Sequence, residues 1–219
     1  MLEYLKANNK TNDVVIDGKV NNDELHRFSK SDLRWAENRY KSFQCRKVKK
    51  GEIYQFEFGK NFMPEMSYEH RGLIIGIKNK LLYVLPIYSY VESKHKDAYH
   101  PVDRPDSQSD EYLLKASEFS CIKHDSILKL NDIRTVSINR ILYKHDGRIA
   151  PNSDTYKSIE KLVLQKYFAE FYFEYEEDKK EIDVLKEQIA ILEEEKIELQ
   201  KNIESLRQEL ENSTKEEEK

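Results

Sequence analysis

Apolar and polar positions alternate in the middle of the chain as they do in short β-strands. In segment 54–58, aromatic residues alternate with Gln55 and Glu57, which is the period of a half-buried strand. Two apolar runs, 73–77 and 81–87, flank the turn sequence Lys-Asn-Lys, so we expect them to form a hairpin. Further short strands are predicted at 112–116, 119–122 and 133–136. Many short strands beside a helix indicate a small, strongly bent sheet or barrel.

The N-terminal part of the chain predicts an arm followed by a helix. Residues 1–22 are rich in Asn, Asp, Lys and Thr and predict a mobile or loosely packed extension. A helix is predicted from about Ser31 to Phe43, with Ser31 as its N-cap. Its apolar face, which includes Leu33 and Tyr40, is expected to pack on the main domain.

Beyond Ser153 the sequence predicts one long helix, because there is no glycine or proline as far as Leu210. Its apolar positions alternate three and four residues apart, and an aromatic version of the pattern extends back to Leu164. The helix either pairs with another chain as a coiled coil or folds back on its own body. The apolar residues form a narrow stripe, which we call the seam, and a narrow seam favours pairing with another chain. Isoleucine at the a positions with leucine at the d positions favours a parallel coiled coil of two helices. The seam consists of Ile182, Leu185, Ile189, Leu192, Lys196, Leu199, Ile203, Leu206 and Leu210.

Charge is divided unevenly along the chain. Charged residues make up 36% of the sequence, more than one compact globule usually carries, so part of the chain should be extended. Residues 174–219 contain 17 acidic and 8 basic residues, a net −9, which leaves +5 of the total −4 for the rest. The body of the protein is therefore mildly basic, which suits a polyanionic partner.

Composition also argues against several classes of protein. No apolar run approaches the roughly 20 residues of a membrane helix, and the N-terminus lacks the apolar core of a signal peptide, so we expect a cytoplasmic protein without membrane contact. Cys45 and Cys121 are interpreted as ordinary thiols. The six histidines do not fall at metal-ligand spacing, so no metal or cofactor is expected.

Residues suited to RNA cleavage gather on both sides of the proposed hairpin: Glu65, His70 and Arg71 before it, and Tyr88 and Ser89 at its end. Cleavage without a metal uses the RNA 2′-hydroxyl as nucleophile, and it requires a proton acceptor, a proton donor and a group that stabilises charge on the phosphate. An arginine fork matches phosphate oxygens, and histidine or glutamate can transfer protons. The hairpin would bring the two groups of residues to one end of the sheet, where functional sites are often built. The alternative interpretation is that these polar residues are only the solvated rim of the sheet.

Four segments resemble, in the same order, those of the MazF/PemK family of toxin endoribonucleases. GEI at 51–53 is similar to the family's Gly-Asp-Ile/Val-like opening, and segment 64–75 places a glutamate and then an arginine before an apolar strand, as the family does. PIYS at 86–89 is similar to the family's Pro-Ile-Thr-Ser-like strand end, and DIRTV at 132–136 resembles its Gln-Ile-Arg-Thr-Ile-like strand. The resemblance covers about residues 49–172.

The resemblance implies a catalytic arginine and a catalytic threonine. Alignment on the arginine selects Arg71, with Gly72 in place of proline, whereas alignment on the apolar strand selects His70. Arg71 is preferred for stabilising transition-state charge and His70 for transferring a proton. Tyr88 occupies the threonine position, so either Ser89 supplies the hydroxyl, or Tyr88 does so with a longer reach, or the site is degenerate.

The polar stretch 92–111 lies where family members vary and where RNA sequence would be selected. A loop of this length is often functional, although a plain solvated loop is the alternative. It offers cations for phosphates and rings for stacking on bases. These residues are Lys94, His95, Lys96, Tyr99, His100 and Arg104.

The resemblance implies an α+β protein with a small SH3-like antiparallel β-barrel (MazF/PemK/CcdB-like) at 46–152. An N-terminal arm and helix would occupy 1–45, and a long coiled-coil helix 153–219. The activity implied is that of a homodimeric toxin that cuts single-stranded RNA, such as mRNA, and is restrained by a cognate antitoxin protein. Two alternatives stay open: a catalytically degenerate barrel that serves as a coiled-coil scaffold or binding protein, and a toxin that acts on a protein target.

Overall fold

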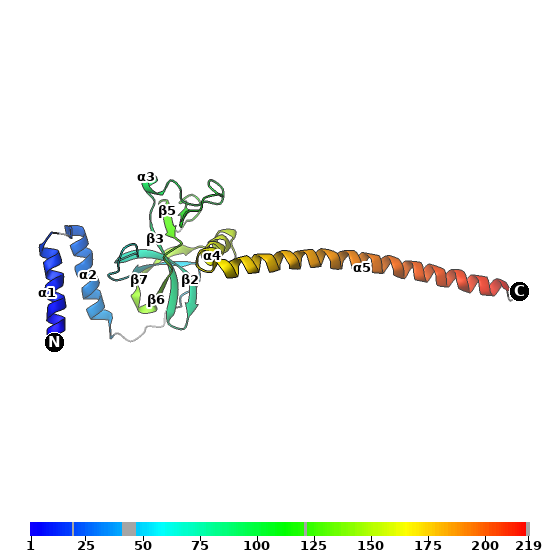
Figure 1. Ribbon diagram of the computed structural model, residues 1–219, viewed down its shortest axis with the longest axis horizontal. Coiled ribbons are helices and arrows are strands. Elements are labelled where there is room, and N and C mark those ends of the chain that lie inside the picture. Colours follow the sequence, from blue (N-terminus) through cyan, green and yellow to red (C-terminus); the bar gives the residue numbers. More distant parts are fainter. Residues whose placement is uncertain (19, 41–46, 121, 218–219) are drawn as a thin grey trace. The chain divides into compact units, whose positions relative to one another are not determined.

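A computed structural model describes residues 1–18, 20–40, 47–120 and 122–217 of the chain, which is an α+β protein (Figure 1). It forms two compact units, Met1–Tyr167 and Phe168–Lys219. The first contains the sheet and most of the helices, and the second is a single helix. No helix among the described residues is both long enough and apolar enough to cross a membrane.

Seven antiparallel strands form the sheet of the first unit. Neighbouring strands follow the order β4-β5-β3-β2-β1-β7. β6 is outside this order and also pairs with β3. The predicted hairpin is confirmed, because β2 and β3 pair in register with Leu73 opposite Leu85. No strand pairing among the described residues closes the sheet into a barrel. The strands are β1 (Glu52–Glu57), β2 (Glu69–Lys78), β3 (Leu81–Ser89), β4 (Glu111–Leu114), β5 (Ser126–Lys129), β6 (Arg134–Ser137) and β7 (Ile141–Arg148).

The two faces of the sheet bury two different cores. Because successive side chains of a strand point to opposite faces, Ile53 of β1 joins one core and Phe56 joins the other. The larger core is completed by α4 (Asp154–Tyr167), which contributes Tyr156. Gly72 lies against side chains of the second core, since a Cβ there would approach Val84 Cγ1 to 2.3 Å. Only glycine fits at this position of β2.

The predicted polar loop after β3 is an ordered segment. It contains the short helix α3 (Glu92–His95) and returns to the sheet through β4. A third, smaller core of Ala98, Leu113 and Ile127 supports it. Of the other predicted strands, 112–116 and 133–136 correspond to β4 and β6, whereas the described residues 119, 120 and 122 form no strand.

The N-terminal region contains two helices, a structure that the prediction of a mobile or loosely packed extension did not specify. Residues of the arm form α1 (Leu2–Ile16), which has no buried residue, and α2 (Asn22–Asn38) follows. Asn21, not Ser31, is the N-cap of α2, because its side chain accepts a hydrogen bond from the backbone N–H of Glu24. The predicted apolar face is also wrong, since Leu33 and Tyr40 are exposed. Residues 41–43 of the predicted helix lie outside the described part of the chain.

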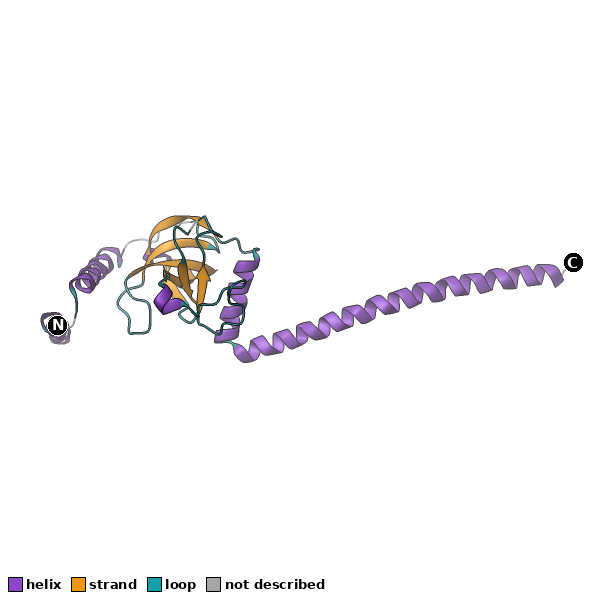
Figure 2. Ribbon diagram, turned by 90° about the horizontal axis from the view of Figure 1, so that it is seen from above, coloured by secondary structure: helices purple, strands orange, loops and turns teal. Residues whose placement is uncertain are grey.

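The C-terminal third is two helices rather than one. α4 ends at Tyr167, and α5 (Ala169–Glu217) begins after Phe168, which is not helical. Ile159 and Val163 of α4 are buried in the larger core of the sheet, so the first unit extends to Tyr167 instead of ending near residue 152. α5 is continuous over 49 residues (Figure 2).

Candidate functional site

One face of the sheet changes from apolar to polar at one end. Leu73 of β2 lies in the larger core, and Arg71, two residues earlier, points to the same face. Cross-strand pairing places Gln55 beside Arg71. Ser89 of β3 and Ser126 of β5 pair with each other and follow the same alternation. Strand ends therefore bring polar side chains together beyond the edge of the core.

Hydrogen bonds and cross-strand pairing bring these residues into a group that we name the Arg71 cluster. Arg71 Nη2 donates to Ser126 Oγ at 3.0 Å, and the fully buried Ser126 hydroxyl donates to the backbone oxygen of His124 at 2.8 Å. The exposed His124 imidazole lies 3.3 Å from Ser89 Oγ. The cluster comprises Gln55, Arg71, Ser89, His124, Ser126 and His145.

His145 of β7 is held in one tautomer. Its Nε2 lies 3.0 Å from Gln55 Oε1, which can only accept, so Nε2 carries the proton and Nδ1 is the basic nitrogen. Burial lowers the pKa of His145 below its ordinary value, and the positive charges of Arg71 and Lys123 lower it further against the opposing effect of Asp146. These effects favour the neutral form of His145, in which a ring nitrogen can accept a proton.

The structure separates the two residues that alignment leaves open. His70 and Arg71 are neighbours in one strand, so they point to opposite faces, and only Arg71 lies on the face where it bonds Ser126. His70 lies opposite Phe56, on the face of the second core. Burial lowers its pKa, and the charges of Arg27 and Arg71 act in the same direction. Arg71 and His70 therefore cannot act together as the sequence suggests.

Tyr88, which occupies the threonine position, also lies away from the Arg71 cluster. Its ring packs on the third core and contacts the ring of His95, with 5.3 Å between the centroids. The phenol donates a hydrogen bond of 2.5 Å to Glu111 Oε1, and burial together with this contact raises the pKa of Tyr88. Ser89 thus provides the hydroxyl that shares a face with Arg71.

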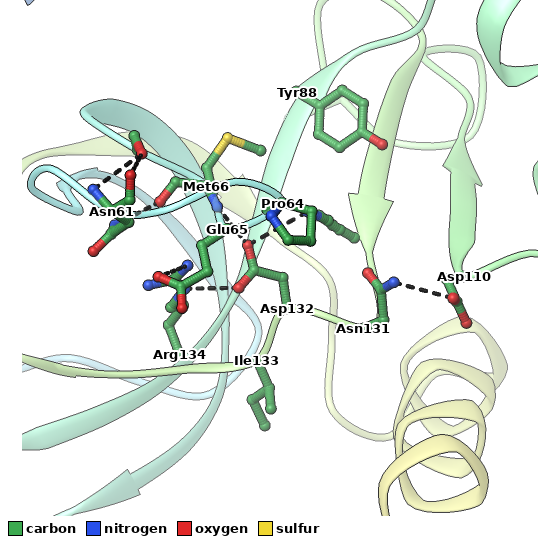
Figure 3. Close-up of polar contacts among 12 residues, drawn as sticks. Asn61, Pro64, Glu65, Met66, Tyr88, Asp110, Asn131, Asp132, Ile133 and Arg134 are labelled. Carbon is green, nitrogen blue, oxygen red and sulfur yellow. Dashed lines mark hydrogen bonds and ion pairs between the residues drawn. The ribbon is translucent and has the colours of Figure 1, made fainter.

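Glu65 is the fifth predicted catalytic residue, and it belongs to a clamp on the β1–β2 loop (Figure 3). Its carboxylate lies 3.2 Å from Arg134 Nη2, and Arg134 Nε donates to the buried Asp132 at 2.7 Å. Asp132 also accepts from the backbone N–H of Met66. These contacts fix the loop and give Glu65 a structural partner.

The six predicted RNA-binding residues divide into two groups. His95 and His100 are buried and engaged: His95 Nδ1 accepts from the backbone N–H of Val91, and His100 Nε2 lies 3.0 Å from Glu118. The half-buried Tyr99 stacks on Tyr112, and Arg104 donates to the backbone of Ala98. The exposed members are Lys94 and Lys96.

A second polar group, the Glu57 cluster, attaches α2 to the sheet within the first unit. The buried Glu57 accepts from Ser31 Oγ at 3.0 Å and from Arg34 Nη1 at 2.9 Å, and Arg34 Nη2 lies 2.6 Å from Glu69. A pocket of about 570 Å³ opens beside it and is lined by further cations, including Arg140. The Glu57 cluster consists of Ser31, Arg34, Glu57 and Glu69.

Sequence patterns alone did not lead to His124, Ser126, His145 or Gln55. Three of them lie on or beside β5 and β7, which the strand pattern did not predict. Applying the two-residue period of strands to β5 would have placed Ser126 on the face of Leu128. The pairing of β1 with β7, which brings His145 to Gln55, joins segments about 90 residues apart and has no local pattern.

The described residues contain no group of three or more His, Cys, Asp or Glu side chains arranged to hold a metal ion. A comparison with protein-family models gives no match to this sequence, and a comparison with curated proteins gives none. The Arg71 cluster combines a guanidinium, two imidazoles, two hydroxyls and an amide. Such groups can bind a phosphate and transfer protons around it.

Proposed function

We propose that this protein is a metal-independent endoribonuclease that cuts single-stranded RNA by attack of the 2′-hydroxyl, and that it is the toxin of a toxin–antitoxin pair in the cytoplasm. The observation that carries the proposal is the link from Arg71 through Ser126 to His124 and Ser89. It gathers, on one partly exposed face, the types of group that such a cleavage requires. Resemblance to the MazF/PemK family supports the same reaction.

Each member of the Arg71 cluster has a role in this reaction. Arg71 binds the scissile phosphate and stabilises the added charge of the phosphorane, and Ser89 donates to a phosphate oxygen. His145 takes the proton of the 2′-hydroxyl through Nδ1 as O2′ attacks phosphorus. His124, in its protonated form, gives a proton to the departing O5′. The products are a 2′,3′-cyclic phosphate and a 5′-hydroxyl, so atoms and charges balance.

The fold expected for this family is a small SH3-like β-barrel, and the support for this finer assignment is that β3 pairs with β2, β5 and β6 in the antiparallel sheet of the first unit. We assign the protein a homodimeric state and a cognate antitoxin that covers the RNA-binding face. Lys94 and Lys96 remain candidates for contacts with RNA phosphates, because they are exposed on the segment after β3.

The test is incubation of the purified full chain with a long single-stranded RNA in EDTA, with the fragment ends mapped. The intact protein should give discrete cuts that end in a cyclic phosphate. Arg71→Ala should reduce the cleavage rate by about 100-fold or more, because it removes the charge that stabilises the phosphorane. Lys80→Ala, at the exposed turn between β2 and β3, is a matched control that removes a cation elsewhere and should cut at the normal rate.

The outcomes separate the proposal from its rivals. Equal cleavage by folded Arg71→Ala and by the intact protein would remove Arg71 from the mechanism. Intact RNA combined with inhibition of cell growth would favour a toxin that acts on a protein. Intact RNA without growth inhibition would favour the scaffold, for which Tyr88 is the specific observation, because the threonine position is occupied by a residue bonded to Glu111.

A further inference from the structure

α5 exposes a continuous apolar stripe along its length. The seven apolar a and d side chains from Ile182 to Leu206 are each 48–64% exposed in the single chain. A helix of 49 residues is about 74 Å long, and helices in water are usually stabilised by packing of their apolar face. α5 therefore requires a partner that offers a matching stripe over the same length.

We propose that this partner is α5 of a second copy of the chain, and that the two helices run parallel and in register. The inference concerns the direction and alignment of the pair and is independent of the proposed RNA cleavage. It rests on the charges at the e and g positions, which flank the seam and determine orientation in coiled coils.

The charges at these flanking positions are complementary for parallel helices. In a parallel pair, each g residue faces the e residue five positions later on the other helix. Glu181 then faces Lys186 of the second copy, at the start of the seam, and Glu174 faces Lys179 just before it. Each pair occurs twice in the dimer. The later pairs are Gln188 with Glu193, Glu195 with Gln200 and Asn202 with Arg207, none of which joins like charges.

Antiparallel helices would lose this complementarity in any alignment. There, g residues face g residues and e residues face e residues. From 174 to 202 the g positions are only acidic or neutral, so no attractive g–g pair can form. The basic residues Lys179, Lys186 and Arg207 all occupy e positions, where they would meet one another or the lone acid Glu193.

Lys196 fixes the register of the parallel pair. In register, the two Lys196 side chains share one layer, where their stems pack and their ammonium groups reach Glu195 of the opposite copy. A shift by one heptad would place each Lys196 against an isoleucine and would bring Glu181 opposite Glu193. Both changes are unfavourable, so the charges select one alignment.

The contacts that these side chains make within α5 are weak competitors. Lys186 lies 3.4 Å from Asp183 of its own helix, but the two side chains are 70% and 64% exposed. Exposed ion pairs of this kind contribute little, so Lys186 can exchange Asp183 for Glu181 of the second copy.

A disulfide tests the orientation in the full chain. Cys45 and Cys121 are replaced by serine, and Leu206→Cys introduces one thiol at a d position near the end of the seam. Parallel helices in register bring the two thiols within the roughly 6 Å Cα separation of a disulfide, so oxidised glutathione should convert most of the protein to a covalent dimer. In an antiparallel pair centred on the seam, the thiols would lie about 30 Å apart along the helix axis.

Gln208→Cys is the matched control, because position 208 is an f position that faces away from the seam. It should form little covalent dimer at the same protein concentration. Absence of cross-linking by Leu206→Cys, or equal cross-linking by both variants, would overturn the proposal. RNA cleavage by the uncross-linked protein is measured separately, so failure of either idea is recognised by itself.

A charge exchange tests the register pairs. Lys186→Glu places two carboxylates opposite each other in each of the two symmetric pairs of the dimer, and it should raise the dissociation constant about tenfold in sedimentation experiments at low salt. Adding Glu181→Lys restores opposite charges and should restore the dissociation constant. Lys201→Glu, at an outward f position, is the control and should leave it unchanged. Equal weakening by Lys201→Glu, or no recovery in the double variant, would overturn the assigned pairs.

Discussion

The Arg71 cluster and the Glu57 cluster involve the same neighbouring strands, but they differ in chemistry. The Glu57 cluster joins two carboxylates to one guanidinium and one hydroxyl, so its positive charge is compensated within the cluster and α2 is connected to the sheet. The Arg71 cluster holds a guanidinium, imidazoles and hydroxyls, and it lies beyond the end of the larger core. Compensated charges stabilise a fold, whereas a cationic and hydroxyl-rich surface suits a phosphate.

The difference also appears in how each group is anchored. Ser126 is fully buried and ties Arg71 to the backbone of His124, so a buried residue orients exposed ones. In the Glu57 cluster the buried residue is itself the charge, and the surrounding groups neutralise it. Changes in the first cluster should therefore alter chemistry more than stability, and changes in the second should do the reverse.

After Arg71→Ala, the largest effect is expected for His145→Gln in the Arg71 cluster. Loss of the proposed proton acceptor should lower the cleavage rate about 100-fold, with little change in stability. The pH profile gives a sharper test. Burial and the charges of Arg71 and Lys123 lower the pKa of His145, so the acidic limb of the cleavage profile of the intact protein should lie below pH 6.5. In His145→Gln the residual cleavage should lack this acidic limb.

His26→Gln is the matched control for His145→Gln, because His26 is exposed on α2. It should leave both the rate and the pH profile as they are. An acidic limb that persists unchanged in His145→Gln would assign the proton transfer to another group and would leave Arg71 as the main feature of the cluster.

A stability effect is expected for Glu57→Ala in the Glu57 cluster. Removing the carboxylate leaves Ser31 and Arg34 without a partner that they share, although Arg34 keeps Glu69. The free energy of unfolding should fall by about 2 kcal/mol, less than for a fully buried pair because Arg34 is partly exposed. Denaturant unfolding measures this change, and amide exchange should show faster opening of α2.

Glu37→Ala, at an exposed position of α2, removes a similar charge and should change stability little. RNA cleavage by Glu57→Ala at a temperature where it is folded should match that of the intact protein. A loss of cleavage comparable to that of Arg71→Ala would show that the two clusters work as one site.

Local sequence patterns predicted the fold best where the structure depends on a single strand or on two strands that are neighbours in the sequence. The alternation around Phe56 and the hairpin of β2 and β3 follow from neighbouring residues. The helix α2 was misplaced because its docking residues are polar: Ser31 and Arg34 reach Glu57 while Leu33 stays exposed. Apolar periodicity does not detect a helix that docks through a buried carboxylate.

The site was predicted in part for a similar reason. Arg71 and Ser89 were found because they lie at the ends of one hairpin, whose register the sequence indicates. His145 approaches Gln55 only through the pairing of β1 with β7, which bulges interrupt, and no local rule predicts that register. Tyr88 and His70 were selected by position in the chain, and the strand period then directed both to the other face.

The smallest effect is expected for His70→Gln. The pH dependence of its stability and of its cleavage rate distinguishes a residue on the face of the second core from a member of the Arg71 cluster. Burial lowers the pKa of His70 in the folded protein, so the unfolded chain binds its proton first as pH falls below 6.5. The free energy of unfolding should therefore decrease with falling pH in this range, and His70→Gln should make that decrease shallower without altering the pH profile of cleavage. Denaturant unfolding at pH 7.5 and 5.5 measures how steeply the free energy of unfolding depends on pH. Acidic groups such as Glu52, whose pKa is lowered from 4.5, titrate below this pH range. An unchanged slope would mean that His70 takes up its proton equally in both states, and a changed cleavage profile would return His70 to the site.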